Sequence, residues 1–374
     1  MAPRPILFCA TGVYGTVGGI ASSNRNVLAA LERLAAETGR RVETLVLGET
    51  GGDAPGYRTF GGDKRRFALA AMMRTLTSDL VVVDHVRLAE APLLVPAFLR
   101  PSVAIFAHGS EATWRIRPSS VTAFAKAKLV LTNSHYTLAR MANYVPAFKG
   151  VACPLGLSPQ FEVQALPPPP SNEAISLQAA DGAERPLDDQ MLLLVSRLDA
   201  TEREKGHREL IAVMPRLLER FPRAQLVMVG AGSDLEPLRE TARASRAAAS
   251  IFLPGRMVEG GLEALYRKAF AYVMPSRQEG FGLVYLEAMN YARPCLACRD
   301  DGAADVVVDG ETGVLVPRDF TDEELLEGLA SLLVDRARAR RYGEAGWRRL
   351  VAGFTASAHQ DRVAQLIRPL IPGI

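Results

Sequence analysis

The fold is indicated most directly by one stretch of sequence, Pro275-Ser-Arg-Gln-Glu-Gly-Phe-Gly-Leu-Val-Tyr-Leu-Glu-Ala-Met289. It follows an apolar run, residues 269–274, that predicts a buried strand, and residues 283–289 have the composition of a helix. Between them stand two glycines, Gly280 and Gly282. A strand, a glycine turn and a helix start direct backbone N–H groups and the positive end of the helix dipole toward an anion. Glycine also lets a ligand approach the main chain closely.

Two carboxylates, Glu279 and Glu287, flank this turn with seven residues between them. Carboxylates would repel a diphosphate directly, so their expected partners are hydroxyl groups beside it. A diphosphate with hydroxyl-bearing groups on either side describes a nucleotide sugar.

With Gly-Phe-Gly inside a Glu-x7-Glu pattern, the stretch resembles the signature of retaining glycosyltransferases of family 4, which have the GT-B architecture. The resemblance implies an α/β protein with two doubly wound, Rossmann-like domains that face a cleft. It also implies that Glu279 binds hydroxyl groups of the donor sugar and that Glu287 binds the ribose. The donor-binding amides would be those of Gly280, Phe281, Gly282 and Leu283.

Bulk properties narrow the class of protein. A chain of 374 residues predicts two domains, and 48% apolar with 23% charged residues is typical of a soluble globular protein. A net charge of +3 argues against a nucleic-acid partner. The apolar runs are shorter than the ~20 residues that span a bilayer, and the first residues show no signal-peptide pattern. We therefore expect a cytoplasmic protein.

Cysteine usage points to a reducing compartment. Four cysteines in a chain of this length do not form a disulfide framework. Cys295 and Cys298 form a Cys-x-x-Cys pair, but no second pair completes a zinc site, so both are expected in the core.

The first half alternates short apolar runs with helix-like stretches, which predicts a mostly parallel sheet covered on both faces. The runs are residues 5–10, 42–47, 80–83, 103–107 and 129–132. His108 directly follows the fourth run, at a strand end that faces the ligand crevice of such sheets. The resemblance implies a catalytic role for His108 near the reacting sugar, and weaker acceptor contacts from Tyr14 and Glu111.

A glycine loop follows the first strand and contains Gly18 and Gly19. It is not a dinucleotide fingerprint, because the spacing is not G-x-G-x-x-G and no acidic residue ends the next strand. This disfavours a Rossmann dehydrogenase. The loop resembles the family's Gly-Gly loop, which lies over the donor phosphate.

Composition changes at Leu166-Pro-Pro-Pro-Pro170, where proline, serine and acidic residues mark a linker or surface insertion. We therefore predict an acceptor-binding domain at 1–165, a linker at 166–190 and a donor-binding domain at 191–350. The last segment, 351–374, is predicted to be a helix that packs back on the first domain.

Arg197 and Lys205 follow a buried strand at 191–195. Two cations at a strand's carboxyl end complement a leaving diphosphate, and the pair resembles the family's Arg…Lys-Gly pattern. The loop 198–204 is longer and more charged than in many members, so Arg197 is expected to act more directly than Lys205. Gly255, Arg256 and Met257 resemble the segment that recognises the base. Asp300-Asp-Gly302 stands where many relatives have a glycine pair, which would alter contacts near the sugar.

The resemblance therefore implies retaining transfer of a hexose from a UDP-, GDP- or ADP-sugar to a glycan, lipid-linked or small-molecule acceptor. The predicted catalytic residues are His108, Arg197, Lys205 and Glu279. No cofactor or metal is required, because cations and a helix start stabilise the diphosphate. A GT-B epimerase or phosphorylase, and a non-catalytic nucleotide-sugar-binding protein, remain alternatives.

A peripheral contact with the inner face of the membrane is also an expectation. Lys64-Arg-Arg66 precedes an apolar segment at 67–73, which could form a basic and apolar patch. The competing interpretation is a surface helix with one buried face.

Overall fold

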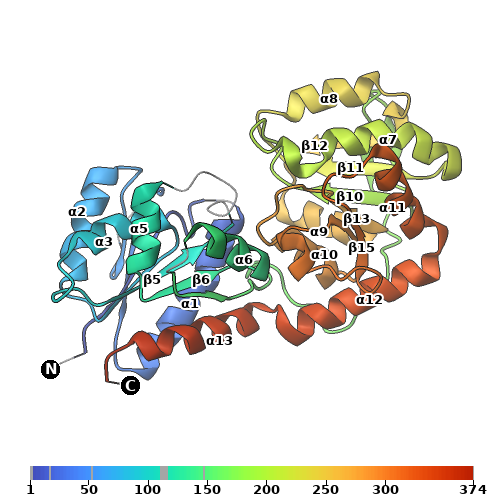
Figure 1. Cartoon of the computed structure of the whole chain (residues 1–374). Helices are drawn as coiled ribbons and strands as arrows, with labels where there is room; N and C mark the ends of the chain where they lie inside the picture. Colours follow the sequence, from blue (N-terminus) through green and yellow to red (C-terminus); the bar gives the residue numbers. More distant parts are fainter. Residues whose placement is uncertain (1–2, 17, 52–53, 110–116, 146–147, 374) are drawn as a thin grey trace. The chain divides into compact units, whose positions relative to one another are not determined.

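The computed structural model describes residues 3–16, 18–51, 54–109, 117–145 and 148–373. The chain divides into two compact units, labelled by their elements in Figure 1. Unit 1 comprises Met1–Phe161 and Gly353–Ile374, and unit 2 comprises Glu162–Ala352. No helix in the described part of the chain is both long and apolar enough to cross a membrane.

The described strands of unit 1 form a parallel sheet in the order β3-β2-β1-β4-β5-β6-β7. Their bounds are β1 (Ile6–Ala10), β2 (Val42–Val46), β3 (Tyr57–Thr59), β4 (Leu80–Val83), β5 (Ser102–Ala107), β6 (Leu129–Thr132) and β7 (Gly150–Ala152). The five apolar runs of the first half are therefore confirmed as strands. The strand β3 was not predicted, because three residues are too few to show a periodic pattern.

Several helices of unit 1 begin at a side-chain cap. The described helices of this unit are α1 (Gly19–Glu37), α2 (Lys64–Thr75), α3 (Glu90–Leu94), α5 (Pro118–Lys126), α6 (His135–Tyr144) and α13 (Ala356–Ile367), with the short 3-10 helices η1 (Val86–Ala89) and η5 (Arg368–Leu370). Asp63 caps α2 by accepting the N–H groups of Arg65 and Arg66, each at 3.1 Å. Ser134 and Thr355 cap α6 and α13 in the same way.

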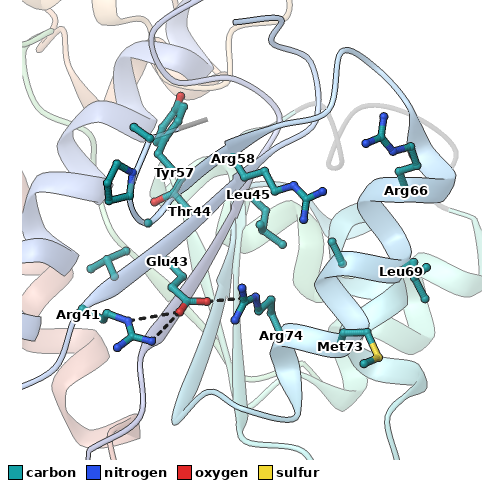
Figure 2. Close-up of a pocket in the computed structure, with 15 residues that line it drawn as sticks. Arg41, Glu43, Thr44, Leu45, Tyr57, Arg58, Arg66, Leu69, Met73 and Arg74 are labelled. Carbon is teal, nitrogen blue, oxygen red and sulfur yellow. Dashed lines mark hydrogen bonds and ion pairs between the residues drawn. The ribbon is translucent and has the colours of Figure 1, made fainter. Parts of the chain in front are cut away.

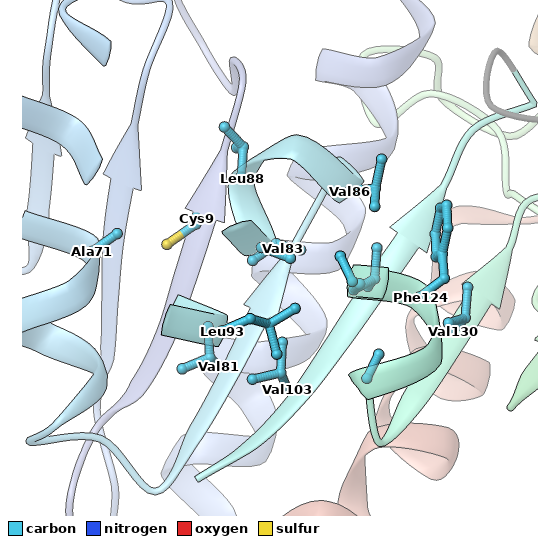
Figure 3. Packing of buried hydrophobic residues seen from close by; sticks show 14 of the residues in the cluster. Cys9, Ala71, Val81, Val83, Val86, Leu88, Leu93, Val103, Phe124 and Val130 are labelled. Atoms are coloured by element: carbon cyan, nitrogen blue, oxygen red, sulfur yellow. The ribbon is translucent and has the colours of Figure 1, made fainter. Parts of the chain in front are cut away.

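Apolar side chains lie on both faces of this sheet. Along β1, Leu7 and Cys9 join one cluster and Ile6, Phe8 and Ala10 join another, as the two-residue period of a strand requires. Figure 3 shows the first cluster, with Val81, Val83 and Phe124 among its members. The second cluster includes Val27 and Leu31 of α1 with Val363 and Ile367 of α13. Helix α13 is thus part of the core of unit 1.

Unit 2 contains a second parallel sheet, in the order β12-β11-β10-β13-β14-β15. Its strands are β10 (Met191–Val195), β11 (Gln225–Val229), β12 (Ile251–Gly255), β13 (Ala271–Val273), β14 (Cys295–Cys298) and β15 (Gly313–Val316). Its helices are α7 (His207–Arg220), α8 (Leu235–Ala244), α9 (Glu259–Lys268), α10 (Leu283–Asn290), α11 (Asp322–Val334) and α12 (Arg336–Gly353), with η2 (Arg203–Lys205), η3 (Ala248–Ser250) and η4 (Gly302–Asp305). Cys295 and Cys298 are buried and free in β14, which confirms that they are core residues.

The segment 166–190 contains a hairpin that its composition did not predict. Strands β8 (Ser176–Gln178) and β9 (Glu184–Pro186) pair antiparallel. Ala179, at the turn, bridges to Phe252 of β12. The segment therefore attaches to the edge of the second sheet, although each of its strands has three residues.

Helix α12 lies close to the residues that follow α10, and two glycines make this approach possible. A Cβ at Gly343 would lie 2.0 Å from the Ala292 carbonyl oxygen, and one at Gly346 would lie 3.0 Å from Met289 Cγ. Side chains at these positions would push α12 away from α10. The predicted domain boundary at 350/351 falls inside α12.

Candidate functional site

The stretch Pro275–Met289 follows strand β13 of unit 2 and forms a turn and most of helix α10. Strand β13 pairs in parallel with β10 and β14, and α10 begins directly after Gly282. Gly282 has a φ of 91°, and a Cβ there would lie 2.3 Å from the Tyr285 ring, so the position requires glycine. Because Gly282 is the N-cap residue and lacks a side chain, it provides no side-chain cap for the first-turn N–H groups. The turn therefore supplies backbone donors suited to an anion.

Lys205 and Glu279 form an ion pair beside this turn. Lys205 Nζ lies 3.0 Å from Glu279 Oε2, and the side chains are 17% and 16% exposed. Gly206 follows Lys205 with a φ of 84°, and a Cβ there would lie 2.6 Å from Pro275 Cγ. Burial disfavours the charged form of Lys205, but the carboxylates of Glu279 and Glu202 outweigh burial and raise its pKa. The ammonium group therefore stays charged in a sheltered place.

Arg197 lies at the same edge of the sheet. It follows β10, which neighbours β13 in parallel, and the carboxyl ends of parallel strands share one edge. Its guanidinium pairs with Glu202, and its side chain is 72% exposed. The structure thus brings Arg197, Lys205 and Glu279 to one edge, with Lys205 better fixed than Arg197.

Glu287 lies in α10 and is largely buried. One of its oxygens accepts a hydrogen bond from the Tyr266 hydroxyl of α9 at 2.8 Å. The Tyr266 ring stacks on Tyr291 with centroids 5.6 Å apart. Burial, together with the charge on Glu287, raises the pKa of Tyr266 well above its ordinary value, so this tyrosine remains a donor. The sequence did not predict Tyr266 as a partner of Glu287, since 21 residues separate them.

The predicted base-recognition segment follows β12. Gly255 ends this strand with a φ of 84°, and its carbonyl oxygen accepts the Gly230 N–H at 3.0 Å. Arg256 is exposed and Met257 is half-buried. Because β12 is parallel to β11 and β11 to β10, these residues also lie at the carboxyl edge of the sheet.

In unit 1, the predicted glycine loop connects β1 to α1. Helix α1 begins at Gly19, and Gly18 precedes it with a φ of 140°. Tyr14 is 64% exposed, and its ring centroid lies 5.9 Å from that of Tyr57. The other predicted acceptor contact, Glu111, lies outside the described residues.

A buried carboxylate that the sequence did not reveal holds this loop. Glu49 accepts the Val13 N–H at 2.5 Å and the Tyr57 hydroxyl at 2.7 Å. Burial acts to raise its pKa, but hydrogen bonds from Val13 and Tyr57 outweigh burial, and the pKa of Glu49 is lowered. The loop is therefore anchored to an ionised group beneath it.

His108 follows β5 at the carboxyl edge of the first sheet. Its carbonyl oxygen accepts a hydrogen bond from the Asn133 side chain at 3.0 Å. Asp84, at the end of the adjacent β4, is fully buried and accepts from the Thr11 N–H at 2.7 Å and from Asn24 Nδ2 at 2.6 Å. Burial raises the pKa of Asp84, and hydrogen bonds from Thr11 and the charge of His108 oppose that rise. Asp84 is thus a second buried carboxylate near the predicted site residues of unit 1.

A cavity of about 810 Å³ lies elsewhere in unit 1, between α2 and the end of the sheet formed by β2 and β3 (Figure 2). Glu43 pairs with Arg41 at 3.1 Å and with Arg74 at 3.4 Å on its wall. Leu69 and Met73 line the same cavity from α2 and are largely exposed. Both arginines and apolar side chains thus line this cavity.

The fold and the carboxyl-edge cluster of unit 2 define the GT-B class of glycosyltransferases. Among solved structures, a sucrose-phosphate synthase from Thermosynechococcus elongatus has a TM-score of 0.74 and 21% identity, covering 98% of this chain and 99% of that one. HepE of Anabaena in complex with UDP has a TM-score of 0.72 and 15% identity, covering 98% and 100%. These similarities extend over both units and show the fold.

Sequence comparison identifies the family. The model described as "Glycosyl transferases group 1" matches residues 180–349. A GDP-mannose-dependent alpha-(1-6)-phosphatidylinositol monomannoside mannosyltransferase from Mycolicibacterium smegmatis is 30% identical over 272 residues, which are 70% of this chain and 68% of that protein. A glycogen synthase from Mycobacterium tuberculosis is 37% identical over 176 residues, 47% of this chain and 41% of that enzyme. The chain belongs to the group 1 glycosyl transferases.

Proposed function

We propose that this glycosyltransferase moves a hexose from a nucleoside-diphosphate sugar, bound by unit 2, to a glycan or lipid-linked acceptor. Transfer retains the anomeric configuration and needs no divalent metal. The observation that carries the proposal is the group of Arg197, Lys205 and Glu279 beside the start of α10.

Charge develops on the diphosphate as its bond to the sugar breaks. Fixed cations and helix-start amides stabilise that charge most strongly in the transition state. The Lys205 ammonium has three donors, so it can hold Glu279 and a phosphate oxygen together. The Glu279 carboxylate has further lone pairs for a sugar hydroxyl, and we assign the ribose hydroxyls to Glu287 of α10.

A thermal-shift panel tests donor binding. The panel contains UDP-, GDP- and ADP-sugars, with GDP-mannose first because one relative is named as GDP-mannose-dependent. A ligand at 100 times its Kd stabilises the folded protein by about 2.7 kcal/mol, which shifts Tm measurably. Absence of any shift across the panel would contradict the proposal.

Turnover assays distinguish the remaining alternatives. With a donor and candidate acceptors, we expect a glycosylated product whose first-formed linkage keeps the donor's anomeric configuration in proton NMR, at a rate that survives EDTA. An inverted linkage, or activity that EDTA abolishes and magnesium or manganese restores, would overturn the corresponding part of the proposal. An epimerase would instead isomerise the donor without acceptor, and a pure binding protein would show no turnover.

We also propose that unit 1 touches an anionic membrane surface through α2 and the loop after α3. Leu94, the last residue of α3, is 76% exposed, and Phe98, in the loop that follows, is 86% exposed. Helix α3 packs against α2, which carries Leu69 and Met73. The arginines around the cavity of Figure 2 supply positive charge next to Leu69 and Met73, a combination that suits anionic lipid headgroups.

Vesicle co-sedimentation tests this contact. The protein should sediment with vesicles that contain an anionic lipid and much less with zwitterionic ones. The double change Leu94→Ser and Phe98→Ser should reduce the bound fraction. Val334→Ser, which alters an apolar side chain of unit 2 that is 66% exposed, serves as the control. Equal vesicle binding by the double variant and the control would refute the proposal that this surface contacts the membrane.

A further inference from the structure

Asp301 is an acidic side chain in an unusual place. It stands between β14 and η4, directly behind the turn that carries Glu279, and it is 1% exposed. Acidic residues are rarely this buried unless they are hydrogen-bonded. The hydrogen bonds of Asp301 therefore indicate its role in the structure.

Asp301 and its neighbour Gly302 hold the backbone of Glu279 at both its N–H group and its carbonyl group. Asp301 Oδ2 accepts the Glu279 N–H at 3.1 Å, and the N–H of Gly302 donates to the Glu279 carbonyl oxygen at 2.8 Å. The other Asp301 oxygen accepts the Ala303 N–H at 2.8 Å, which fixes the carboxyl group itself. A Cβ at Gly302 would lie 2.1 Å from the Gly280 carbonyl oxygen, so the two loops are in direct contact. The loop that presents backbone donors to an anion is thus anchored through Asp301.

The charge on Asp301 matters because Glu279 is close. Burial, and next the charge on Glu279, raise the pKa of Asp301 to about 8, while its two amide hydrogen bonds and Arg318 oppose the rise. The other titratable groups facing it are Cys298 of β14 and Tyr285 of α10, whose pKa values are themselves raised by burial and by Asp301. Lys205 compensates Glu279 from η2. Below about pH 8 the Asp301 carboxyl group is therefore mostly protonated and neutral. Above about pH 8 it adds a negative charge that no cation in the described part of the chain compensates as Lys205 compensates Glu279.

We propose that Asp301 positions the Glu279 peptide for donor binding and, by releasing its proton, sets the pH above which unit 2 holds a nucleotide sugar less tightly. The proposal rests on the proposed role of Glu279 and the α10 turn as the donor site. Ionised Asp301 adds a second negative charge behind the turn that receives the diphosphate. If the protonated form is the binding-competent one, the apparent Kd rises as that form is depleted, by about tenfold at one pH unit above the midpoint.

The test is a titration of wild type with UDP-glucose, GDP-mannose and ADP-glucose between pH 6.5 and pH 9, at constant ionic strength. For each probe that binds, wild type should show a Kd that is flat below pH 7.5 and about tenfold weaker at pH 9. Asp301→Asn keeps an acceptor without a charge and should bind with a flat profile. Asp301→Ala removes the acceptor for the Glu279 N–H and should bind more weakly at every pH, also without a slope.

Glu240→Gln is the control, because it removes the charge of an exposed carboxylate in α8 of the same unit. It should follow wild type, including any titration of the nucleotide base. A slope that persists in Asp301→Asn would overturn the inference, and so would a flat wild-type profile, which needs no variant to fold. If wild type binds none of the three probes at any pH, the proposed donor site fails and this inference fails with it. Binding with an unaltered slope in the variants defeats the inference alone.

Discussion

Lys205 and Arg197 carry the same charge but have different surroundings. Lys205 is mostly buried and bonded to Glu279, whereas Arg197 is mostly exposed and bonded to Glu202. A preorganised donor stabilises developing charge without reorganising when the reaction occurs. The longer loop before Lys205 led us to expect the smaller effect from Lys205, but the geometry leads us to expect the larger one.

Replacing either cation with alanine should lower turnover. By analogy with the loss of one preorganised donor, Arg197→Ala and Lys205→Ala should each reduce kcat on the order of 100- to 1,000-fold. Lys205→Ala should also raise the donor KM, because it leaves Glu279 without its partner. Steady-state kinetics on the identified donor measures both parameters. Lys268→Ala, which removes a lysine bonded to the Glu173 carbonyl oxygen in the same unit, should leave kcat unchanged.

The Tyr266–Glu287 hydrogen bond predicts a graded pair of effects on donor affinity. Glu287→Ala removes a charge-assisted contact worth roughly 1.5–3 kcal/mol, so the donor Kd should rise about 10- to 100-fold. Tyr266→Phe keeps the carboxylate and removes the donor that orients it, so a rise of less than about tenfold is expected. Calorimetry with the identified donor measures both. An unchanged Kd in Glu287→Ala would remove Glu287 from the site.

At the scale of elements, α12 supports α10, the helix that begins directly after Gly282. Gly343 and Gly346 let it approach Met289 and Ala292, at the end of α10. The sequence of α12 is rich in arginine and contains three glycines, so its pattern does not predict a long helix. Gly343 and Gly346 are instead explained by their close contacts with Ala292 and Met289.

Gly343→Ala should destabilise unit 2, because the new Cβ would lie 2.0 Å from a backbone oxygen that cannot move freely. Overpacking of this kind costs about 1–3 kcal/mol. Gly353→Ala is the matched control at the end of the same helix, where a Cβ would meet nothing within 4 Å. It should be neutral or slightly stabilising, as alanine favours helix over glycine. Urea unfolding of both variants measures the difference, and equal stabilities would contradict this account of α12.

Much of the element order was readable from the sequence, because the buried strands appear in it as short continuous apolar runs. Leu80–Val83, Leu129–Thr132 and Met191–Val195 are continuous apolar runs with the bounds of β4, β6 and β10, since strands of a parallel sheet are buried on both faces. The hairpin of β8 and β9 has no such run, and its residues are mostly exposed.

The turn and the charges of the candidate site were readable because each of two sets stands close together in the chain, Arg197 with Lys205 and Glu279 with the glycine turn. The ion pair between the two sets joins residues 74 positions apart and was not readable. The supporting contacts of the site were not readable either, because their partners are distant. Glu49 lies 36 residues from Val13, Asp84 lies 60 residues from Asn24, and Asp301 lies 22 residues from Glu279. Each pair is brought together by adjacent strands or packed loops, which no local pattern records.

At the scale of the whole molecule, each unit contains a buried histidine that must stay neutral. Burial, and for His207 also the charge of Lys205, lowers the pKa of His207 in unit 2 to about 4. Burial lowers the pKa of His359 in unit 1 to about 3. In the unfolded chain both would titrate near 6.5. The unfolded state therefore binds more protons between about pH 4 and pH 6.5.

Both units should consequently lose stability as the pH falls from about 6.5 toward 4, with the full contribution present above pH 6.5. For His207 the shift corresponds to on the order of 3 kcal/mol, at about 1.4 kcal/mol per pKa unit. Hydrogen exchange resolved by peptide, corrected for the intrinsic rate, follows each unit separately, which matters because two units need not unfold together. In His207→Gln the acid loss should shrink in unit 2 and persist in unit 1. The same loss in both units would contradict the assignment.

Helix α13 gives the chain a particular order of assembly. In the sequence, unit 1 comprises residues that precede unit 2 and residues that follow it. Val363 and Ile367, from the later part, complete one hydrophobic cluster of unit 1 against α1. A ribosome makes the whole of unit 2 before it makes these residues. Unit 2 can therefore fold while it is being synthesised, whereas one face of the earlier-made sheet stays uncovered until α13 emerges. During that interval the nascent first half exposes apolar surface, and that is when it would need a chaperone.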